Sequence, residues 1–346
     1  MKPNQTGSGP KPIQRLFSLL WAGLLLGFTL FAALDTFVIE HTYAVAEAPQ
    51  STPASAAEST GLTAIEVTPL SSSEAPANTE APAAAEPTEE AAEPAATETA
   101  PTLISTDSRY ADGNVSITLK EIRAYDSTIY VADVVLSSPE YLQTALANSA
   151  YGRNVTAKTS AIAQNANAIL AINGDYYGAR ETGYVIRNGV LYRSKAAKNA
   201  EDLVIYRDGS FEIIQESQIS AQELLDKGAW NVLCFGPALL IDGELAVDAN
   251  DEVGRAMASN PRTAIGIIDP LHYVFLVSDG RTSASEGLSL LELAQVLQEL
   301  GVQTAYNLDG GGSSTMVFQG RVVNNPTTNG KRVSERSVSD IVCIAC

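Results

Sequence analysis

Three consecutive glycines, Gly310, Gly311 and Gly312, follow Asp309 in the segment QTAYNLDGGGSSTMVF, residues 303–318. Glycine lacks a Cβ, so this segment can adopt positive φ angles and approach a ligand closely. The residues on either side predict a short strand before the glycines and a second strand after them. One carboxylate and several hydroxyls therefore gather at a turn. The pattern fits two interpretations, a plain β-hairpin with an Asp-Gly turn or a ligand-binding loop.

The first 45 residues contain one apolar run, from Leu16 to Leu34, without a charged side chain. That length is about what a helix needs to cross the hydrocarbon core of a bilayer. Three basic residues precede the run, so the positive-inside rule places the N-terminus in the cytoplasm and the bulk of the chain outside. We therefore expect residues 1–45 to form a cytoplasmic tail and a signal-anchor transmembrane helix at about 16–34. Secretion after cleavage of a signal peptide is the alternative.

Residues 46–100 are mainly Ala, Pro, Thr, Ser and Glu, with ten Glu and no Lys or Arg. Such a composition cannot bury a core, so we predict a disordered, extended stalk. The remaining segment, 101–346, has the length of one large domain or two small ones, and we expect one domain. The whole chain carries a formal net charge of −18, which argues against nucleic acid as a partner. Any anion that binds must be met by individually placed arginines.

Cysteine and histidine are both scarce, with three and two residues in the chain. An odd number of cysteines offers no full disulfide framework, and we expect Cys343 and Cys346 to form a strand-end pair or an incidental disulfide. Only His272 lies in 101–346, which excludes a His-rich zinc site and leaves proton transfer to carboxylates. No cofactor is predicted with certainty, and an oxygen-ligated divalent cation such as Ca²⁺ or Mg²⁺ stays compatible with the sequence.

The predicted elements indicate an α+β fold, with a mixed, hairpin-rich β-sheet and a few covering helices, preceded by the transmembrane helix and the disordered stalk. Asn-Gly or Asp-Gly pairs between apolar runs predict hairpins at 187–190, 207–210 and 241–244. Alternating apolar residues predict another hairpin from 115–124 and 129–136. Helices are predicted at 138–147, 159–165, 221–227 and 290–300. The last has a capping box at its start and a glycine at its end.

Four polar clusters lie at the ends of apolar strands, where packing alone explains them poorly. A plain turn accounts for any one of them taken separately. Arginine beside carboxylate at several strand ends, however, is what a site for a phosphorylated sugar requires. The clusters contain Asn173 and Asp175; Arg262; Asp279 and Arg281; and Asn307, Asp309, Ser313 and Ser314.

Five segments in order along the chain resemble the phosphodiester glycosidase family: NGDYYG, PRTAIGI, SDGR, SLLELAQVLQELGVQTAYNLDGGGSSTM and ERSVSD. The resemblance covers roughly residues 150–346, and NLDGGGSSTM is its most specific part. The N-terminal hairpin, the stalk and the apolar helix carry no motif of the family. The ordered occurrence of all five segments favours the ligand-binding interpretation of the glycine loop.

This resemblance implies hydrolysis of a sugar-1-phosphodiester, similar to an N-acetylglucosamine-1-phosphodiester. Asp175 and Asp309 are the implied acid/base or nucleophile pair, because glycosidic cleavage usually needs two carboxyls. A phosphate leaves readily, so one carboxylate could suffice. Arg262, Arg281 and Arg336 would bind the phosphate. The other implied pocket residues are Asn173, Asp279, Asn307, Ser313, Ser314, Gly310, Gly311 and Gly312, with the glycine amides and serine hydroxyls completing an anion nest.

We therefore predict a membrane-anchored, extracytoplasmic hydrolase that acts on glycosyl phosphates of cell-wall or exopolysaccharide material. Its partners would be that substrate and, through the N-terminal helix, the cell membrane. One alternative is a non-catalytic glycan-binding module of the cell envelope on the same scaffold, and another is a structural adhesin. Paired carboxylates near arginines favour the enzyme, because a binding module does not need them.

Overall fold

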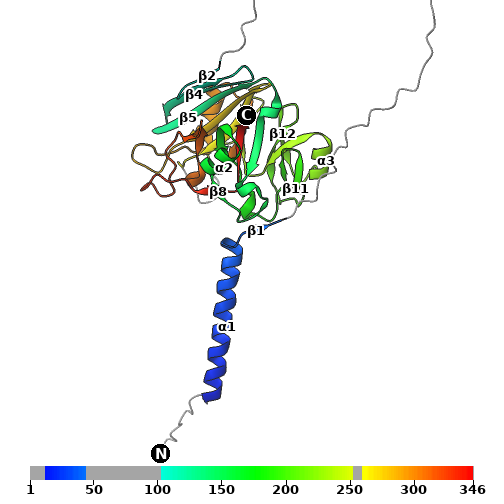
Figure 1. The fold of residues 1–346 in the computed structure, drawn as a ribbon, viewed down its shortest axis with the longest axis vertical. Coiled ribbons are helices and arrows are strands. Elements are labelled where there is room, and N and C mark those ends of the chain that lie inside the picture. The colour runs from blue at the N-terminus through cyan, green and yellow to red at the C-terminus, as the bar shows by residue number, and fades with distance from the viewer. Residues whose placement is uncertain (1–11, 44–102, 252–258, 346) are drawn as a thin grey trace, which may run out of the picture. The chain divides into compact units, whose positions relative to one another are not determined.

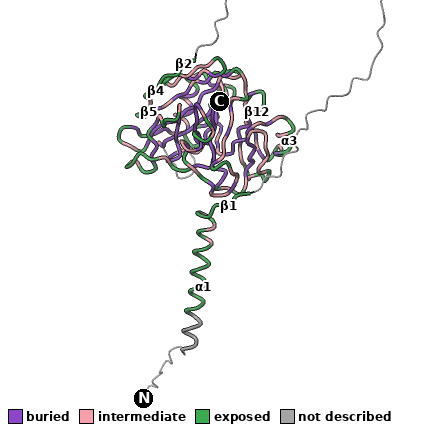
Figure 2. The backbone as a smooth tube through the Cα atoms, in the orientation of Figure 1, coloured by how far each residue is buried: buried purple, intermediate pink, exposed green. Residues whose placement is uncertain are grey.

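The computed structural model describes residues 12–43, 103–251 and 259–345 (Figure 1). The predicted stalk at 46–100 and Cys346 lie outside the described residues. The N-terminal apolar run forms α1 (Pro12–Phe37), and its segment Leu19–Thr36 is long and apolar enough to cross a membrane. Its described side chains are mostly exposed (Figure 2). Length and composition are compatible with a membrane anchor and equally with a signal sequence.

Three antiparallel sheets make up most of the described chain after α1, so the fold is strand-rich with few helices, as expected. The largest sheet has nine strands in the order β16-β15-β19-β17-β18-β5-β4-β3-β2. Its strands are β2 (Ile104–Ser105), β3 (Arg109–Ala111), β4 (Val115–Ala124), β5 (Ser127–Leu136), β15 (Ala238–Ile241), β16 (Glu244–Leu245), β17 (Thr263–Asp269), β18 (His272–Ser278) and β19 (Thr304–Leu308).

Two five-stranded sheets and two short ladders complete the strand pairing of the described residues. One sheet has the order β11-β10-β14-β12-β13, with β10 (Val185–Arg187), β11 (Val190–Arg193), β12 (Glu201–Tyr206), β13 (Phe211–Gln215) and β14 (Ala229–Leu233). The other has the order β21-β20-β9-β23-β6, with β6 (Leu142–Leu146), β9 (Ala168–Asn173), β20 (Met316–Phe318), β21 (Arg321–Val322) and β23 (Asp340–Ala345). The ladders pair β1 (His41–Thr42) with β7 (Gly152–Arg153), and β8 (Ala157–Lys158) with β22 (Ser337–Val338).

The three sheets share one hydrophobic core, because each contributes alternate side chains to it. In β18, Tyr273, Phe275 and Val277 belong to this common core, while Val274 and Leu276 belong to a second cluster on the opposite face. The strand interiors are accordingly buried (Figure 2). The sheets therefore meet through their inner faces, and their strand ends can meet at one place.

Each sheet packs its outer face against one helix. The helix α4 (Leu290–Glu299) packs on the nine-stranded sheet, α2 (Thr159–Asn165) on β9 and β23, and α3 (Ala221–Asp226) on the sheet of β10 to β14. Capping boxes open both α3 and α4, and each satisfies two backbone groups that a helix start leaves unpaired. Four 3₁₀ turns complete the helical segments: η1 (Pro139–Tyr141), η2 (Ala147–Ser149), η3 (Tyr177–Ala179) and η4 (Gly311–Ser313).

Most predicted elements are confirmed, including the hairpins and the helices at 159–165, 221–227 and 290–300. Two expectations are wrong. The predicted helix at 138–147 is the turn η1 followed by β6, because pairing with β23 outweighs local helix preference. The described strands pair antiparallel rather than in one mixed sheet. Of the two interpretations of the glycine stretch, the plain hairpin is excluded, since β19 and β20 belong to different sheets.

We predict that Gly287→Ala destabilises the fold much more than Gly320→Ala does. Both glycines have positive φ, +104° and +75°, which costs an alanine about 1–2 kcal/mol. A Cβ on Gly287 would lie 2.3 Å from the backbone carbon of Asn260, whereas nothing lies within 4 Å of one on Gly320. Overpacking against backbone adds about 1–3 kcal/mol. Urea unfolding of both variants measures the difference, and equal losses would contradict this prediction.

Candidate active site

The ends of strands from two of the three sheets surround one pocket of about 410 Å³. Asp175 follows the end of β9, Asp309 follows the end of β19, and Ser339 precedes β23. Because strands of different sheets end here, polar residues far apart in sequence come together. The lining residues include Asp175, Tyr176, Asp309, Ser313, Arg336 and Ser339.

Of the two aspartates that line this pocket, Asp309 is the one that solvent can reach, with 13% of its side chain exposed. Both of its oxygens accept from Nη2 of Arg336, at 3.4 and 3.3 Å. Arg336 is held in place by further bonds, from Nη2 to the carbonyl of Gly310 at 3.0 Å and from Nε to Oγ of Ser313 at 2.8 Å. Burial raises the pKa of Asp309, and Arg336 and Ser313 act against that rise. A carboxylate and a guanidinium thus share the pocket mouth.

Asp175 is 1% exposed and its oxygens are already occupied by protein donors. Its Oδ1 accepts from the backbone N–H of Tyr177 at 2.9 Å, and its Oδ2 accepts from Nη2 of Arg187 at 2.8 Å and from the N–H of Cys234 at 2.9 Å. Arg187 donates through Nε to Oδ2 of Asp340 at 2.7 Å. One buried guanidinium therefore bridges two buried carboxylates, in a cluster that we call the Asp175–Arg187–Asp340 triad.

The triad holds one positive and two negative groups away from solvent, so its charges are not balanced. Burial alone would lower the pKa of Arg187, but the two carboxylates raise it well above its usual range. Burial raises the pKa of Asp340 to about 7, with Asp175 adding to the rise and Arg187 opposing it. That pKa exceeds the usual value of about 4. The contribution of the Asp340 carboxyl to the free energy of unfolding therefore falls as pH rises from about 4 to about 7.

In the glycine loop, which contains Gly310, Gly311 and Gly312, neighbouring atoms lie close to the glycine Cα atoms, and several backbone amides already have acceptors. A Cβ on Gly311, where φ is +63°, would lie 2.9 Å from Nη2 of Arg281, and one on Gly312 would lie 2.4 Å from a hydroxyl. Amides of the loop are already used: Gly311 donates to a carbonyl of residue 261, and Ser313 and Ser314 close the 3₁₀ turn η4. The expected anion nest is therefore only partly available from these amides, while Arg336 accounts for positive charge at the loop.

Arg281 lies beside Gly311 and forms no ion pair with the residues that the structure describes. Its Nε and Nη2 donate to Oδ1 of Asn260 at 3.1 and 3.0 Å, and its Nη1 donates to the carbonyl of Thr328 at 2.6 Å. Burial and repulsion from Arg336 lower its pKa, which indicates that the two guanidiniums are near neighbours. Positive charge therefore concentrates on one side of the glycine loop.

Asn173 fastens the loop instead of lining the pocket. It is fully buried, and its Nδ2 donates to the carbonyl of Asp309 at 2.6 Å. Its Oδ1 accepts from Oγ1 of Thr263 at 2.8 Å and from the N–H of Thr315 at 3.2 Å. One side chain thus joins β9, β17 and the glycine loop.

Four other predicted site residues are buried in the surrounding network and do not line this pocket. Arg262 is 3% exposed, and its Nε donates to the carbonyl of Leu288 at 2.8 Å. Both oxygens of Asp279 accept from neighbouring amides. Asn307 and Ser314 lie at 1% and 0% exposure. Their places favour positioning over direct contact with a substrate.

Sequence reasoning missed Arg187 and Asp340. The sequence marks Arg187 only as the flank of an Asn-Gly turn and Asp340 only as part of a segment that resembles the family. The available signal was a single charged residue at the boundary of a buried apolar strand, in YVIRNG and in VSDIVCIA. A buried charge is costly unless it is paired, so each such residue calls for a partner elsewhere in the chain.

Comparison with known proteins now decides the family, since the family model described as phosphodiester glycosidase matches residues 166–345. The chain belongs to the phosphodiester glycosidase family. Its relatives include N-acetylglucosamine-1-phosphodiester alpha-N-acetylglucosaminidase of Mus musculus, 28% identical over 56% of this chain and 40% of that protein. Another is the SPbeta prophage-derived protein YomE of Bacillus subtilis, 29% identical over 57% of this chain and 31% of that protein. The chain thus spans about a third to two fifths of the length of these curated relatives.

Solved structures support the fold. The catalytic domain of zebrafish N-acetylglucosamine-1-phosphodiester alpha-N-acetylglucosaminidase, auto-inhibited by its pro-peptide, matches with a TM-score of 0.54 and 21% identity. That match covers 67% of this chain and 83% of the other. A hypothetical protein from Synechocystis matches with a TM-score of 0.52 and 17% identity, over 66% of this chain and 62% of the other. At these identities the likeness concerns the arrangement of the chain alone.

We predict that Arg187→Met destabilises the protein by about 3–5 kcal/mol near pH 8, because two buried carboxylates lose their cation. The loss should shrink near pH 5. Without Arg187 the pKa of Asp340 rises further, so acid protonates its carboxyl and removes the unpaired charge. Arg207→Met is the matched control, since Arg207 is exposed and stacks on Trp230 at 4.4 Å. Chemical unfolding at both pH values provides the measurement, and a pH-independent loss would argue against this role of the triad.

Proposed function

We propose that this chain hydrolyses a sugar-1-phosphodiester of the N-acetylglucosamine-1-phosphodiester type in cell-wall or exopolysaccharide material. Membership of the phosphodiester glycosidase family supports the reaction class. The observation that carries the proposal is the contact between Asp309 and Arg336 at the mouth of the pocket. That pocket, at about 410 Å³, falls in the range of roughly 300–1,000 Å³ usual for small-ligand sites.

In this proposal Asp309 and Asp175 have different roles. Asp309 is the one that can act on the anomeric centre or on a water, as nucleophile or general base, because solvent reaches it. Asp175 has donors on both oxygens and serves best as a fixed negative charge that holds the pocket wall. A raised pKa suits a carboxylate that accepts a proton near neutral pH. The expected pair of equivalent carboxyls thus becomes one reactive carboxylate and one positioning carboxylate.

Phosphate recognition in this proposal falls to Arg336, with Arg281 nearby. In hydrolysis, a water oxygen bonds to the anomeric carbon and the bond from that carbon to the phosphate oxygen breaks. The electron pair leaves on the phosphate, whose growing charge a guanidinium stabilises. The proton lost by water passes to Asp309 or onward to solvent. Because phosphate departs as a stabilised anion, no strong general acid is required on the leaving side.

We predict that Asp309→Asn lowers kcat for a glycosyl phosphodiester, such as N-acetylglucosamine-1-phosphomethyl, by about 10²- to 10⁴-fold. Arg336→Met should raise KM and lower kcat, because it removes charge felt in both the bound and the transition state. The control is Asp107→Asn, whose side chain is 91% exposed and should leave turnover unchanged. Product release by wild type and the variants is followed directly.

The same assay separates an enzyme from a glycan-binding module. Saturable binding without release of sugar would favour the binding module. Turnover that survives Asp309→Asn would overturn the role of Asp309 while leaving the family assignment intact.

We further propose that α1 is an uncleaved anchor and that the 101–346 domain lies outside the cell. The helix has the length and apolar composition for this, and basic residues precede it in the sequence. The full chain should then stay with membranes after an alkaline wash, and protease added outside intact cells should degrade the domain. Recovery of a shortened chain in the medium would instead indicate signal-peptide cleavage.

A further inference from the structure

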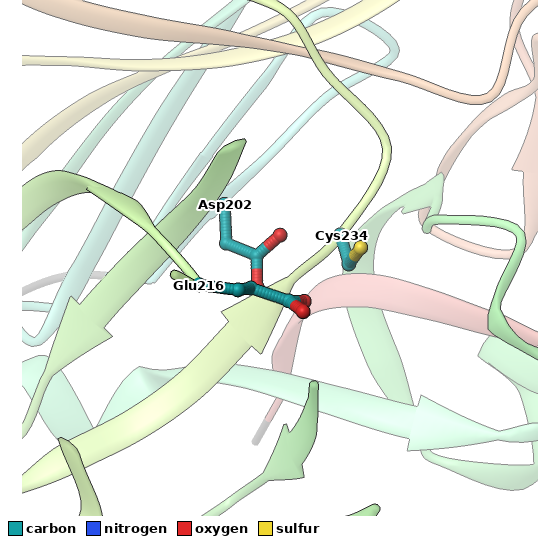
Figure 3. A group of neighbouring side chains, drawn as sticks. All are labelled: Asp202, Glu216 and Cys234. Atoms are coloured by element: carbon teal, nitrogen blue, oxygen red, sulfur yellow. The ribbon is translucent and has the colours of Figure 1, made fainter. Parts of the chain in front are cut away.

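Behind the pocket, Asp202, Glu216 and Cys234 turn their side chains toward one another (Figure 3). One oxygen of each carboxylate and the sulfur of the thiol lie within 4.8 Å of one another. Asp202 comes from β12, Glu216 follows β13, and Cys234 follows β14. Their exposures are 0%, 3% and 2%, so all three are buried.

Asp202 is the group in this cluster that most requires a partner. By distance and angle neither of its carboxylate oxygens has a hydrogen-bond donor, and the groups that interact with it are the side chains of Glu216 and Cys234 themselves. A buried carboxylate without a donor is costly, so such oxygens call for a cation or a proton. Both oxygens belong to a side chain that points into the cluster (Figure 3).

The other two side chains are held ready by the surrounding backbone. Oε1 of Glu216 accepts from the N–H of Tyr184 at 2.7 Å, and Oε2 accepts from the N–H of Ala197. A carboxylate oxygen has two lone-pair sites, so each can still bind a cation. Cys234 is a free thiol, and its carbonyl accepts from Nη1 of Arg180 at 3.2 Å.

We propose that Asp202, Glu216 and Cys234 bind a thiophilic divalent cation, with Zn²⁺ as the best match. Zinc takes carboxylate oxygens at about 2.0–2.2 Å and thiolate sulfur at about 2.3 Å, so one ion can reach all three atoms. A thiol disfavours Ca²⁺ and Mg²⁺, which prefer oxygen alone. This site needs no histidine, so the scarcity of that residue does not exclude it.

The charges of the cluster also favour a divalent cation. Two carboxylates and a thiolate carry three negative charges. Arg180, whose Nη1 lies 4.0 Å from the sulfur of Cys234, supplies one positive charge, and a divalent cation supplies two. Bound zinc would thus make the cluster neutral. A proton on Asp202 is the alternative way to reduce the negative charge of the cluster. Burial raises the pKa of Asp202 to about 9, and a protonated Asp202 would donate a hydrogen bond to Glu216.

A cation here would support the pocket without touching a substrate. The N–H of Cys234 donates to Oδ2 of Asp175 at 2.9 Å, so the cluster connects directly to the triad. Through Glu216 it also fixes the backbone at Tyr184 and Ala197. The role is therefore structural, and it does not depend on the reaction that the pocket carries out.

The test uses the full-length protein, equilibrated with Zn²⁺ and freed of excess metal by gel filtration. Elemental analysis should find zinc in stoichiometric amount in wild type and much less in Asp202→Asn and Cys234→Ser. With Cd²⁺ as the probe, wild type should show a sulfur-to-metal ultraviolet band that Cys234→Ser lacks. Added Zn²⁺ should raise the Tm of wild type by mass action and leave that of both variants unchanged.

Cys343→Ser is the matched control, because Cys343 is also a buried free cysteine but lies in β23. It should keep zinc, the cadmium band and the shift in Tm. If Asp202→Asn does not fold, Cys234→Ser and the control still decide the question. The proposal is overturned if wild type retains no zinc at micromolar metal, or if the cadmium band persists in Cys234→Ser. Absence of zinc together with a stable Asp202→Asn variant would identify a shared proton instead.

Discussion

The ion triad of Asp175, Arg187 and Asp340 is the interaction on which the rest of the site depends. Its members come from residues near the ends of β9, β10 and β23, and therefore from two different sheets. A buried cation between two carboxylates tolerates little displacement, because any lengthening leaves charge uncompensated in a medium of low dielectric. The triad thus fixes the relative position of the sheets at the point where the pocket opens. The common core holds the sheets together, and the triad fixes how the ends of β9, β10 and β23 lie relative to one another.

The glycine loop provides the second connection, between the nine-stranded sheet and the sheet of β9. Its strands could have formed a hairpin, but the side chain of Asn173 binds the carbonyl of Asp309 and links the loop to β9 instead. Glycine is required at Gly312 because a neighbouring hydroxyl occupies the space of a Cβ. The loop is therefore held by its surroundings, and Asp309 is presented on a rigid support. Such preorganisation is what a reactive carboxylate needs.

Local patterns predicted the elements well, since hairpin turns and capped helices depend on neighbouring residues. The Asn-Gly turn at Asn188 and the capping box at Ser289 formed as expected. The local pattern predicts a helix at 138–147, but residues 142–146 form β6 because their partner, β23, lies almost 200 residues later. Which sheet a strand joins depends on such distant pairs, and no local pattern encodes them. For the same reason the family resemblance implies that Asp309 and Arg336 line one pocket, and only the structure shows their contact.

Sequence alone also could not assign different parts to the two carboxylates. Asp175 and Asp309 both follow apolar strands, so their local patterns are alike. They differ in what distant segments supply: Arg187 and Cys234 occupy the oxygens of Asp175, whereas one partly exposed arginine contacts Asp309. Fixed protein donors fill both oxygens of Asp175, whereas burial raises the pKa of Asp309 against the opposing effect of Arg336 and Ser313. In the function proposed above, this difference in hydrogen bonding assigns the reaction to Asp309 and a positioning role to Asp175.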